Sequence, residues 1–147
     1  MTAPHGGANH NVSFSPAAVD DLRSIMQRMP RVGLQVLALL KQLAAGQVRP
    51  RRLRSFGKTG DLGDCGKLAV VVEGEPEHRI VVRDLGDGRF RVVEVIAIEE
   101  RADDLVYLLA GIRLGRILDP VRKSDVERRL ARIVAERQRR TRGQPPT

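Results

Sequence analysis

The chain has 147 residues, 41% of them hydrophobic, and a single cysteine, Cys65. This length suits one domain with a core of its own, and a lone cysteine excludes an internal disulfide and a metal site built on several thiolates. The longest apolar runs, such as 105–112, are far shorter than the roughly 20 residues of a membrane span. The N-terminus has neither the basic nor the apolar region of a signal peptide, so we expect a cytoplasmic protein.

The net charge of +8 comes from 26 Lys and Arg residues against 18 Asp and Glu residues. Such an excess indicates a polyanionic partner or an acidic protein partner. It is concentrated in two stretches: residues 49–58, which contain no acid, and residues 113–142, with eleven basic and four acidic residues. Both are candidates for phosphate binding. The alternative stays open, above all for the second stretch, that the basic residues only solvate exposed helix faces.

Two adjacent helices are predicted after a disordered leader over residues 1–11. Ser15-Pro16 supplies an N-cap and a first-turn proline for a helix over 16–29. Pro30 starts a second helix, which Gly46 ends. The two amphipathic helices form a hairpin that must bury its apolar stripe against another element.

Three β-rich segments follow the helical hairpin: Lys67–Glu73, His78–Asp84 and Arg89–Glu99. Their short connections predict an antiparallel meander. Side-chain alternation gives this sheet one apolar face, which packs on the helices, and one cationic face. Glu94 falls on the apolar face, which indicates a bulge or an edge position there. The residues expected on the apolar face are Leu68, Val70, Val72, Ile80, Val82, Phe90, Val92, Ile96 and Ile98, and those on the cationic face are Lys67, Arg79, Arg83, Arg89 and Arg91.

The C-terminal part is predicted to be helical. Asp103-Asp104 suits the N-terminus of a helix whose apolar positions run from Leu105 to Ile112. Asp119-Pro120 ends it, and the capping-box pattern from Ser124 to Glu127 starts a last amphipathic helix. We expect a disordered tail over residues 143–147. The predicted fold is therefore α+β: an N-terminal helical hairpin packed on a small antiparallel sheet, followed by C-terminal helices.

Common enzyme signatures are absent from the sequence. It has no Gly-rich phosphate loop, no histidine pair at metal-binding spacing, and no histidine outside the leader except His78. We therefore predict neither a metal site nor a cofactor. Cys65 is better explained as a small packing residue at a strand entrance than as a nucleophile.

Several segments in order resemble the RelE branch of the RelE/ParE toxins. They are Phe14-Ser15-Pro16, the run from Asp61 to Leu68, His78 to Val82, Val93 to Arg101, and Val106-Tyr107. The resemblance covers about residues 12–117, which leaves 118–142 as a basic helical extension. It implies the toxin of a type II toxin–antitoxin system: an mRNA interferase that cleaves mRNA on the ribosome without a metal and is neutralised by a cognate antitoxin. In this chemistry the ribose 2′-hydroxyl attacks its own 3′ phosphate.

Carried over by position, the resemblance implies a catalytic set of Lys67, Arg79, Arg101 and Tyr107. Preorganised cations stabilise the charge that develops on the phosphate, and Arg101 is assigned this role. Tyr107 acts as a base only if Arg79 and Arg101 depress its pKa. The residues expected to bind RNA and the ribosome are Arg49, Arg51, Arg52, Arg54, Lys58 and Arg83.

The chain departs from the family pattern at three places. Ala69 stands where a second lysine is usual, Gly66 replaces an aromatic residue, and Glu99-Glu100 puts acid beside Arg101. Each change weakens a site for an anionic substrate. Two alternatives therefore stay open: a non-catalytic inhibitor of the ParE type, which binds a protein such as DNA gyrase, and an inactive basic RNA-binding relative. With three Phe, one Tyr and no Trp, binding would depend on phosphate contacts and shape more than on base stacking.

Overall fold

The computed structural model describes residues 10–56, 58–141 and 143. Residues 1–9 and 144–147, most of the predicted leader and tail, lie outside this part of the chain. The helices are α1 (Pro16–Arg28), α2 (Pro30–Ala44), the short 3₁₀ turn η1 (Ala102–Asp104), α3 (Leu105–Arg113) and α4 (Pro120–Thr141). The strands are β1 (Asn11–Phe14), β2 (Arg51–Arg52), β3 (Ser55–Phe56), β4 (Gly60–Asp61), β5 (Cys65–Val70), β6 (His78–Asp84) and β7 (Val92–Glu100).

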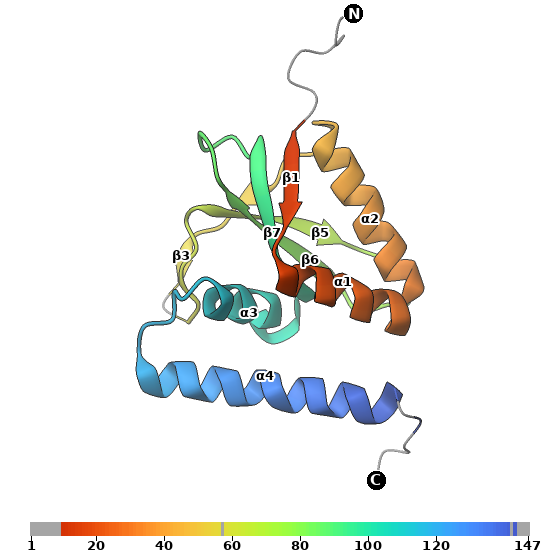
Figure 1. Ribbon diagram of the computed structural model, residues 1–147, viewed down its shortest axis with the longest axis vertical. Coiled ribbons are helices and arrows are strands. Elements are labelled where there is room, and N and C mark those ends of the chain that lie inside the picture. Colours follow the sequence, from red (N-terminus) through yellow and green to blue (C-terminus); the bar gives the residue numbers. More distant parts are fainter. Residues whose placement is uncertain (1–9, 57, 142, 144–147) are drawn as a thin grey trace, which may run out of the picture.

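The main sheet has five strands in the order β1-β7-β6-β5-β2 (Figure 1). The predicted meander of β5, β6 and β7 is confirmed, with β6 at the predicted bounds. β1 was not predicted, and it pairs parallel to β7, so the sheet is mixed. Asn11, placed in the leader by the sequence analysis, belongs to this strand. The four residues of β1 alternate, with Val12 and Phe14 against the core, but so short a run does not reveal a strand without the pairing with β7.

The predicted helical hairpin is confirmed at its caps. The Ser15 hydroxyl accepts a hydrogen bond from the Ala18 amide at 3.2 Å, and Pro16 occupies the first turn. Met29 closes α1, since its amide donates to the Ile25 carbonyl at 2.7 Å, and Pro30 begins α2. Both helices pack on one face of the sheet and form the larger core. Its fully buried members include Ala18, Ile25, Val32, Val36, Leu43, Val70, Ile80, Val82, Val93, Val95 and Ile98.

The second face of the sheet is not the open cationic surface that the sequence predicted. α3 covers it, and a second core forms there. The consecutive buried residues Ile80, Val81 and Val82 explain this, because a strand that is apolar on both faces is covered on both faces. Arg89 and Arg91 precede β7 and lie outside the strands. The second core contains Leu53, Leu62, Cys65, Val81, Ile96, Ala97, Val106 and Ala110.

A bulge in β7 divides the strand between the two cores. Val81 pairs with Ala97 and Val82 pairs with Val95, so Ile96 is the extra residue. The alternation therefore changes sides, and both Ile96 and Ala97 face the second core. The bulge expected near Glu94 is thus confirmed, whereas the expectation that Val92 and Ile96 face the helical hairpin is wrong: Val92 is exposed.

The last helix begins earlier than the sequence indicated. α4 starts at Pro120, and the Asp119 carboxylate accepts a hydrogen bond from the Val121 amide at 3.2 Å. The predicted capping box at Ser124 is therefore wrong, because that residue already lies inside the helix. Asp104 precedes α3 with a left-handed backbone (φ 59°) and makes no side-chain cap.

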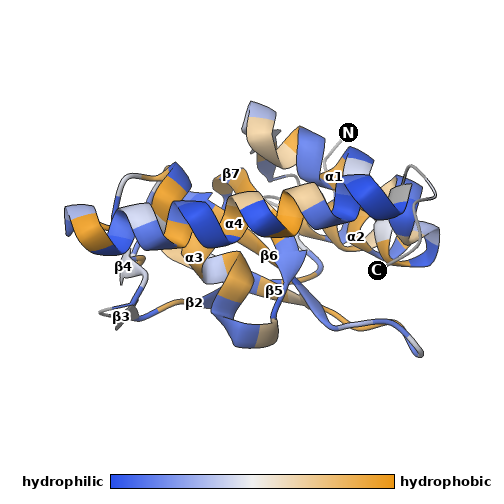
Figure 2. Cartoon of the chain, turned by 90° about the horizontal axis from the view of Figure 1, so that it is seen from below, coloured by the Kyte–Doolittle hydropathy of each residue, from blue (hydrophilic) through white to orange (hydrophobic). Residues whose placement is uncertain are grey.

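α4 lies along α3 and passes the end of α1 (Figure 1). Figure 2 shows apolar positions interrupting an otherwise hydrophilic helix. Val126 is buried against Leu108 and Ile117, while Val121 remains exposed. No helix among the described residues is long and apolar enough to cross a membrane.

Candidate active site

A pocket of about 630 Å³ opens between the β2–β4 region and α3. Three of the four predicted catalytic residues, Lys67, Arg101 and Tyr107, line it. Six of its lining residues are cations and one is an acid, so the pocket suits a polyanion. The other lining residues are Arg51, Arg52, Leu53, Arg54, Lys58, Thr59 and Asp104.

Lys67 and Tyr107 meet in this pocket. β5 directs Lys67 to the second face of the sheet, beside α3, and its Nζ lies 5.9 Å from the centroid of the Tyr107 ring. Burial lowers the pKa of Lys67, and the charges of Arg79, Arg51 and Arg101 lower it further. The lowered pKa means that Lys67 loses its proton more readily than an isolated lysine does.

Tyr107 does not have the depressed pKa that a base requires. Burial raises the pKa of the phenol, although the guanidinium groups of Arg79 and Arg101 oppose that effect. The phenolic oxygen is buried and makes no hydrogen bond of ordinary geometry within the described part of the chain. The condition set in the sequence analysis for Tyr107 to act as a base is therefore not met.

Arg79 and Arg101 share one acidic partner, Glu77. Its carboxylate pairs with Arg79 and lies 3.7 Å from Nε of Arg101. Arg79 is mostly buried and does not line the pocket, whereas the Arg101 side chain is 59% exposed. Sequence reasoning missed Glu77, although its place two residues before Arg79 gives both side chains the same face. Glu77 partly neutralises two of the four candidate catalytic side chains.

The predicted RNA-binding residues separate into three groups. Arg51, Arg54 and Lys58 line the pocket with exposed side chains. Arg52 also lines it, but its guanidinium joins loops by donating to the carbonyls of Gly63 at 2.8 Å and Gly88 at 2.7 Å. The remaining two lie elsewhere: Arg49 lines a separate hollow with Arg89 and Arg91, and Arg83 pairs with Asp64.

Asp64 anchors the loop that precedes β5. Arg116 donates two hydrogen bonds of 2.9 Å to its carboxylate, and these lower the pKa of Asp64 to about 2. The adjacent Cys65 is fully buried, and burial raises the pKa of its thiol to about 12. A thiol with so high a pKa is no nucleophile at neutral pH, in accord with the packing role expected for Cys65.

Much of the basic charge of residues 113–142 serves the fold. Arg113 donates to both carboxylate oxygens of Asp21, at 2.6 and 2.8 Å, and Arg137 donates to both of Glu99, at 2.7 and 2.8 Å. Arg122 donates to the Lys58 carbonyl at 2.8 and 3.0 Å. The hydrogen bonds of these three residues within the fold match neither expectation of the sequence analysis, phosphate binding or the solvation of an exposed helix face.

The fold also gathers side chains that sequence spacing could not connect. His78 at the start of β6 and Glu99 and Glu100 at the end of β7 bring three potential metal-ligand atoms within 4.8 Å of one another. The sequence analysis considered only histidine pairs at metal-binding spacing. It therefore missed these three residues, which strand pairing brings together.

Comparisons with known proteins identify the fold. No family model and no curated protein matches the chain. Among solved structures, it is similar to a mutant of the E. coli toxin RelE in the free state, with a TM-score of 0.51 and 22% sequence identity. The match covers 75% of this chain and 99% of that one. The fold is therefore RelE-like, an α+β architecture, as the sequence predicted.

Proposed function

We propose that this chain is a RelE-type toxin: a cytoplasmic, ribosome-dependent mRNA endonuclease neutralised by a cognate antitoxin. The observation that carries the proposal is the convergence of Lys67, Arg101 and Tyr107 in one cationic pocket, in a RelE-like fold. The pocket also contains Arg51, Arg54 and Lys58, which suit contacts to an RNA backbone. We assign the activity to residues 12–117 and a bracing role to the extension 118–142.

The proposed reaction needs a base, fixed positive charge and no cofactor. The 2′-oxygen forms a bond to the adjacent phosphorus as the bond from phosphorus to the 5′-oxygen breaks, leaving a cyclic phosphate and a 5′-hydroxyl. Lys67, in its neutral form, takes the 2′-hydroxyl proton, since burial and nearby cations favour that form. Solvent returns a proton to the leaving oxygen.

Arg101 stabilises the charge that builds on the phosphate. Its side chain lines the pocket and is the more exposed of the two arginines beside Glu77. Arg79, mostly buried, acts through the field it exerts on Lys67 and Tyr107. Because arginine stays protonated, both contribute charge and not protons.

Two features of the chain reduce the strength of this anion site. Ala69, exposed on the same strand as Lys67, offers no second cation. Glu77 neutralises part of the charge of Arg79 and Arg101. We therefore expect cleavage that is slower than the full set of cations would give.

The test compares mRNA cleavage by wild type and Arg101→Ala on purified translating ribosomes. We expect cuts within the translated frame and a loss of about 10² to 10³ in rate for the variant. Arg128→Ala, which removes an exposed cation on α4, is the matched control and should cut at the wild-type rate. Circular dichroism checks that all three fold. Intact mRNA with wild type, together with inhibition of DNA supercoiling, would favour the ParE-like alternative instead.

A further inference from the structure

His78 presents an unpartnered ring nitrogen inside the protein. The residue is fully buried, and its Nδ1 lies 2.8 Å from the Pro76 carbonyl oxygen. A carbonyl only accepts hydrogen bonds, so Nδ1 carries the proton in this contact. In the neutral ring Nε2 then holds a lone pair, and it has no hydrogen-bond partner among the described residues.

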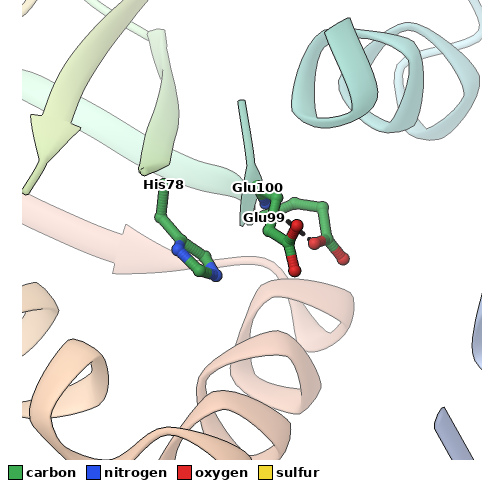
Figure 3. Close-up of side chains that lie close together, drawn as sticks. All are labelled: His78, Glu99 and Glu100. Atoms are coloured by element: carbon green, nitrogen blue, oxygen red, sulfur yellow. Dashed lines mark hydrogen bonds between the residues drawn. The ribbon is translucent and has the colours of Figure 1, made fainter. Parts of the chain in front are cut away.

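Two carboxylates lie beside this nitrogen (Figure 3). His78 pairs with Glu100 across β6 and β7, and Glu99 is the neighbouring residue. The three ligand atoms lie within 4.8 Å of one another. The Arg137 guanidinium already neutralises part of the charge of these carboxylates, so the Nε2 lone pair is the ligand of the group that has no partner among the described residues.

We propose that His78, Glu99 and Glu100 bind a divalent transition metal of the zinc class, through Nε2 and one oxygen of each carboxylate. Two carboxylates balance the charge of such an ion, and an imidazole ligand favours zinc over magnesium or calcium. Ligands at about 2.1 Å in a tetrahedron are roughly 3.4 Å apart, so atoms now up to 4.8 Å apart must approach by up to about 1.4 Å through side-chain rotation. The bond from Nδ1 to a backbone carbonyl is the support that metal-binding histidines commonly have.

Arg137 is the competitor of the ion at this site. It donates to both Glu99 oxygens and lies 3.5 Å from a Glu100 oxygen. Zinc takes one of these oxygens and repels the guanidinium, so the ion and the end of α4 compete for the same acids. The proposed metal site lies at the start of β6 and the end of β7, and it does not depend on whether the chain cleaves RNA.

Zinc binding to the full chain, measured by isothermal titration calorimetry, tests the site. All measurements use a His5→Gln/His10→Gln background, which removes the histidines near the N-terminus. We expect one zinc per chain, and magnesium should not compete. His78→Gln should weaken binding by at least about 100-fold, because even outer-shell partners of a metal are worth about 10- to 100-fold.

If His78→Gln does not fold, two further variants still test the site. Glu100→Gln alters a partly exposed side chain and should also lose zinc, whereas Arg137→Gln should tighten binding by about 10-fold, the scale of one charge-assisted hydrogen bond. Absence of saturable binding, or zinc affinity unchanged by both His78→Gln and Glu100→Gln, overturns the proposal.

Discussion

The ammonium group of Lys67 lies over the face of the Tyr107 ring, 5.9 Å from its centroid. This pairing joins a strand residue to a helix residue forty positions later in the chain. It also assigns different tasks to the two side chains: Lys67 has the lowered pKa, and Tyr107, with a raised pKa, supports it with its ring. Substitutions at the two positions should therefore have different effects on cleavage.

Lys67→Arg should lose at least about 10² in cleavage rate, because arginine keeps the positive charge but cannot act as a base at neutral pH. Wild-type cleavage should rise with pH as Lys67 loses its proton. Single-turnover rates on ribosomes measured over a range of pH check both points. A Lys67→Arg variant with wild-type rates would show that the residue supplies charge only.

Tyr107→Phe should cleave within about threefold of wild type, since the ring face remains and the buried phenolic oxygen makes no hydrogen bond of ordinary geometry with the described residues. Tyr107→Leu should lose about 2- to 5-fold, because the ammonium group no longer lies over an aromatic ring. Rate measurements on both variants, with thermal unfolding to confirm the fold, test this order. If Tyr107→Phe alone abolishes cleavage in a folded protein, the hydroxyl takes part in the chemistry.

Glu77→Gln should bind RNA more tightly, because Arg79 and Arg101 lose their shared acidic partner. If one further phosphate is engaged, the slope of log affinity against log salt should steepen by about 0.7. Filter binding of a short single-stranded RNA at several salt concentrations measures it. Glu75→Gln, in the same connection, is the control and should leave the slope unchanged.

The exposed cations of the pocket should carry the salt dependence of RNA binding. Replacing Arg51, Arg54 and Lys58 together by alanine should reduce the slope by about 0.7 for each phosphate that is no longer neutralised. The same filter-binding series measures the change. Arg52 is left intact, because it holds two loops together. A triple variant with the wild-type slope would exclude this segment from the interface.

Asp64 should make stability depend on acidity. Its folded-state pKa of about 2 is below the ordinary 3.8, so its contribution is present above about pH 4 and is lost as the pH falls towards 2. Asp64→Asn should have a lower unfolding midpoint at neutral pH and a flatter dependence below pH 4, measured by urea denaturation. Asp20→Asn, which changes a highly exposed carboxylate, should have the same unfolding midpoint as wild type both at neutral pH and below pH 4. Equal pH profiles for wild type and Asp64→Asn would contradict the assignment.

The parts of the fold with strong local signals were predictable. Pro16 and Pro30 fix two helix starts, and β6 matches its predicted range. The parts decided by distant partners were not. β1 depends on pairing with β7, and the early start of α4 depends on the Asp119 carboxylate, where the capping-box pattern at Ser124 was misleading.

Of the four residues that the resemblance implied, three line the pocket and Arg79 does not, and the electrostatics of the pocket were not predictable. Lys67, Arg101 and Tyr107 follow from the resemblance, and the pocket brings them together. The sequence contains no measure of burial, and burial is what raises the pKa of Tyr107 and lowers that of Lys67. Nor does sequence spacing show that Glu77 pairs with two arginines, because Arg101 follows β7 and lies far from Glu77 in the sequence.

One extra residue, Ile96, lets odd-numbered positions of β7 lie on both faces of the sheet. Beyond Ile96, the odd-numbered positions of β7 turn from the helical hairpin towards α3, and Arg101 continues that series to the mouth of the pocket. Deleting Ile96 would restore regular alternation without moving Arg101 to the other side, because Val95 and Ala97 already pair with the adjacent residues Val82 and Val81. Val95 and Arg101 are an even number of positions apart and yet lie on opposite sides of the sheet, because one residue between them has no partner on β6.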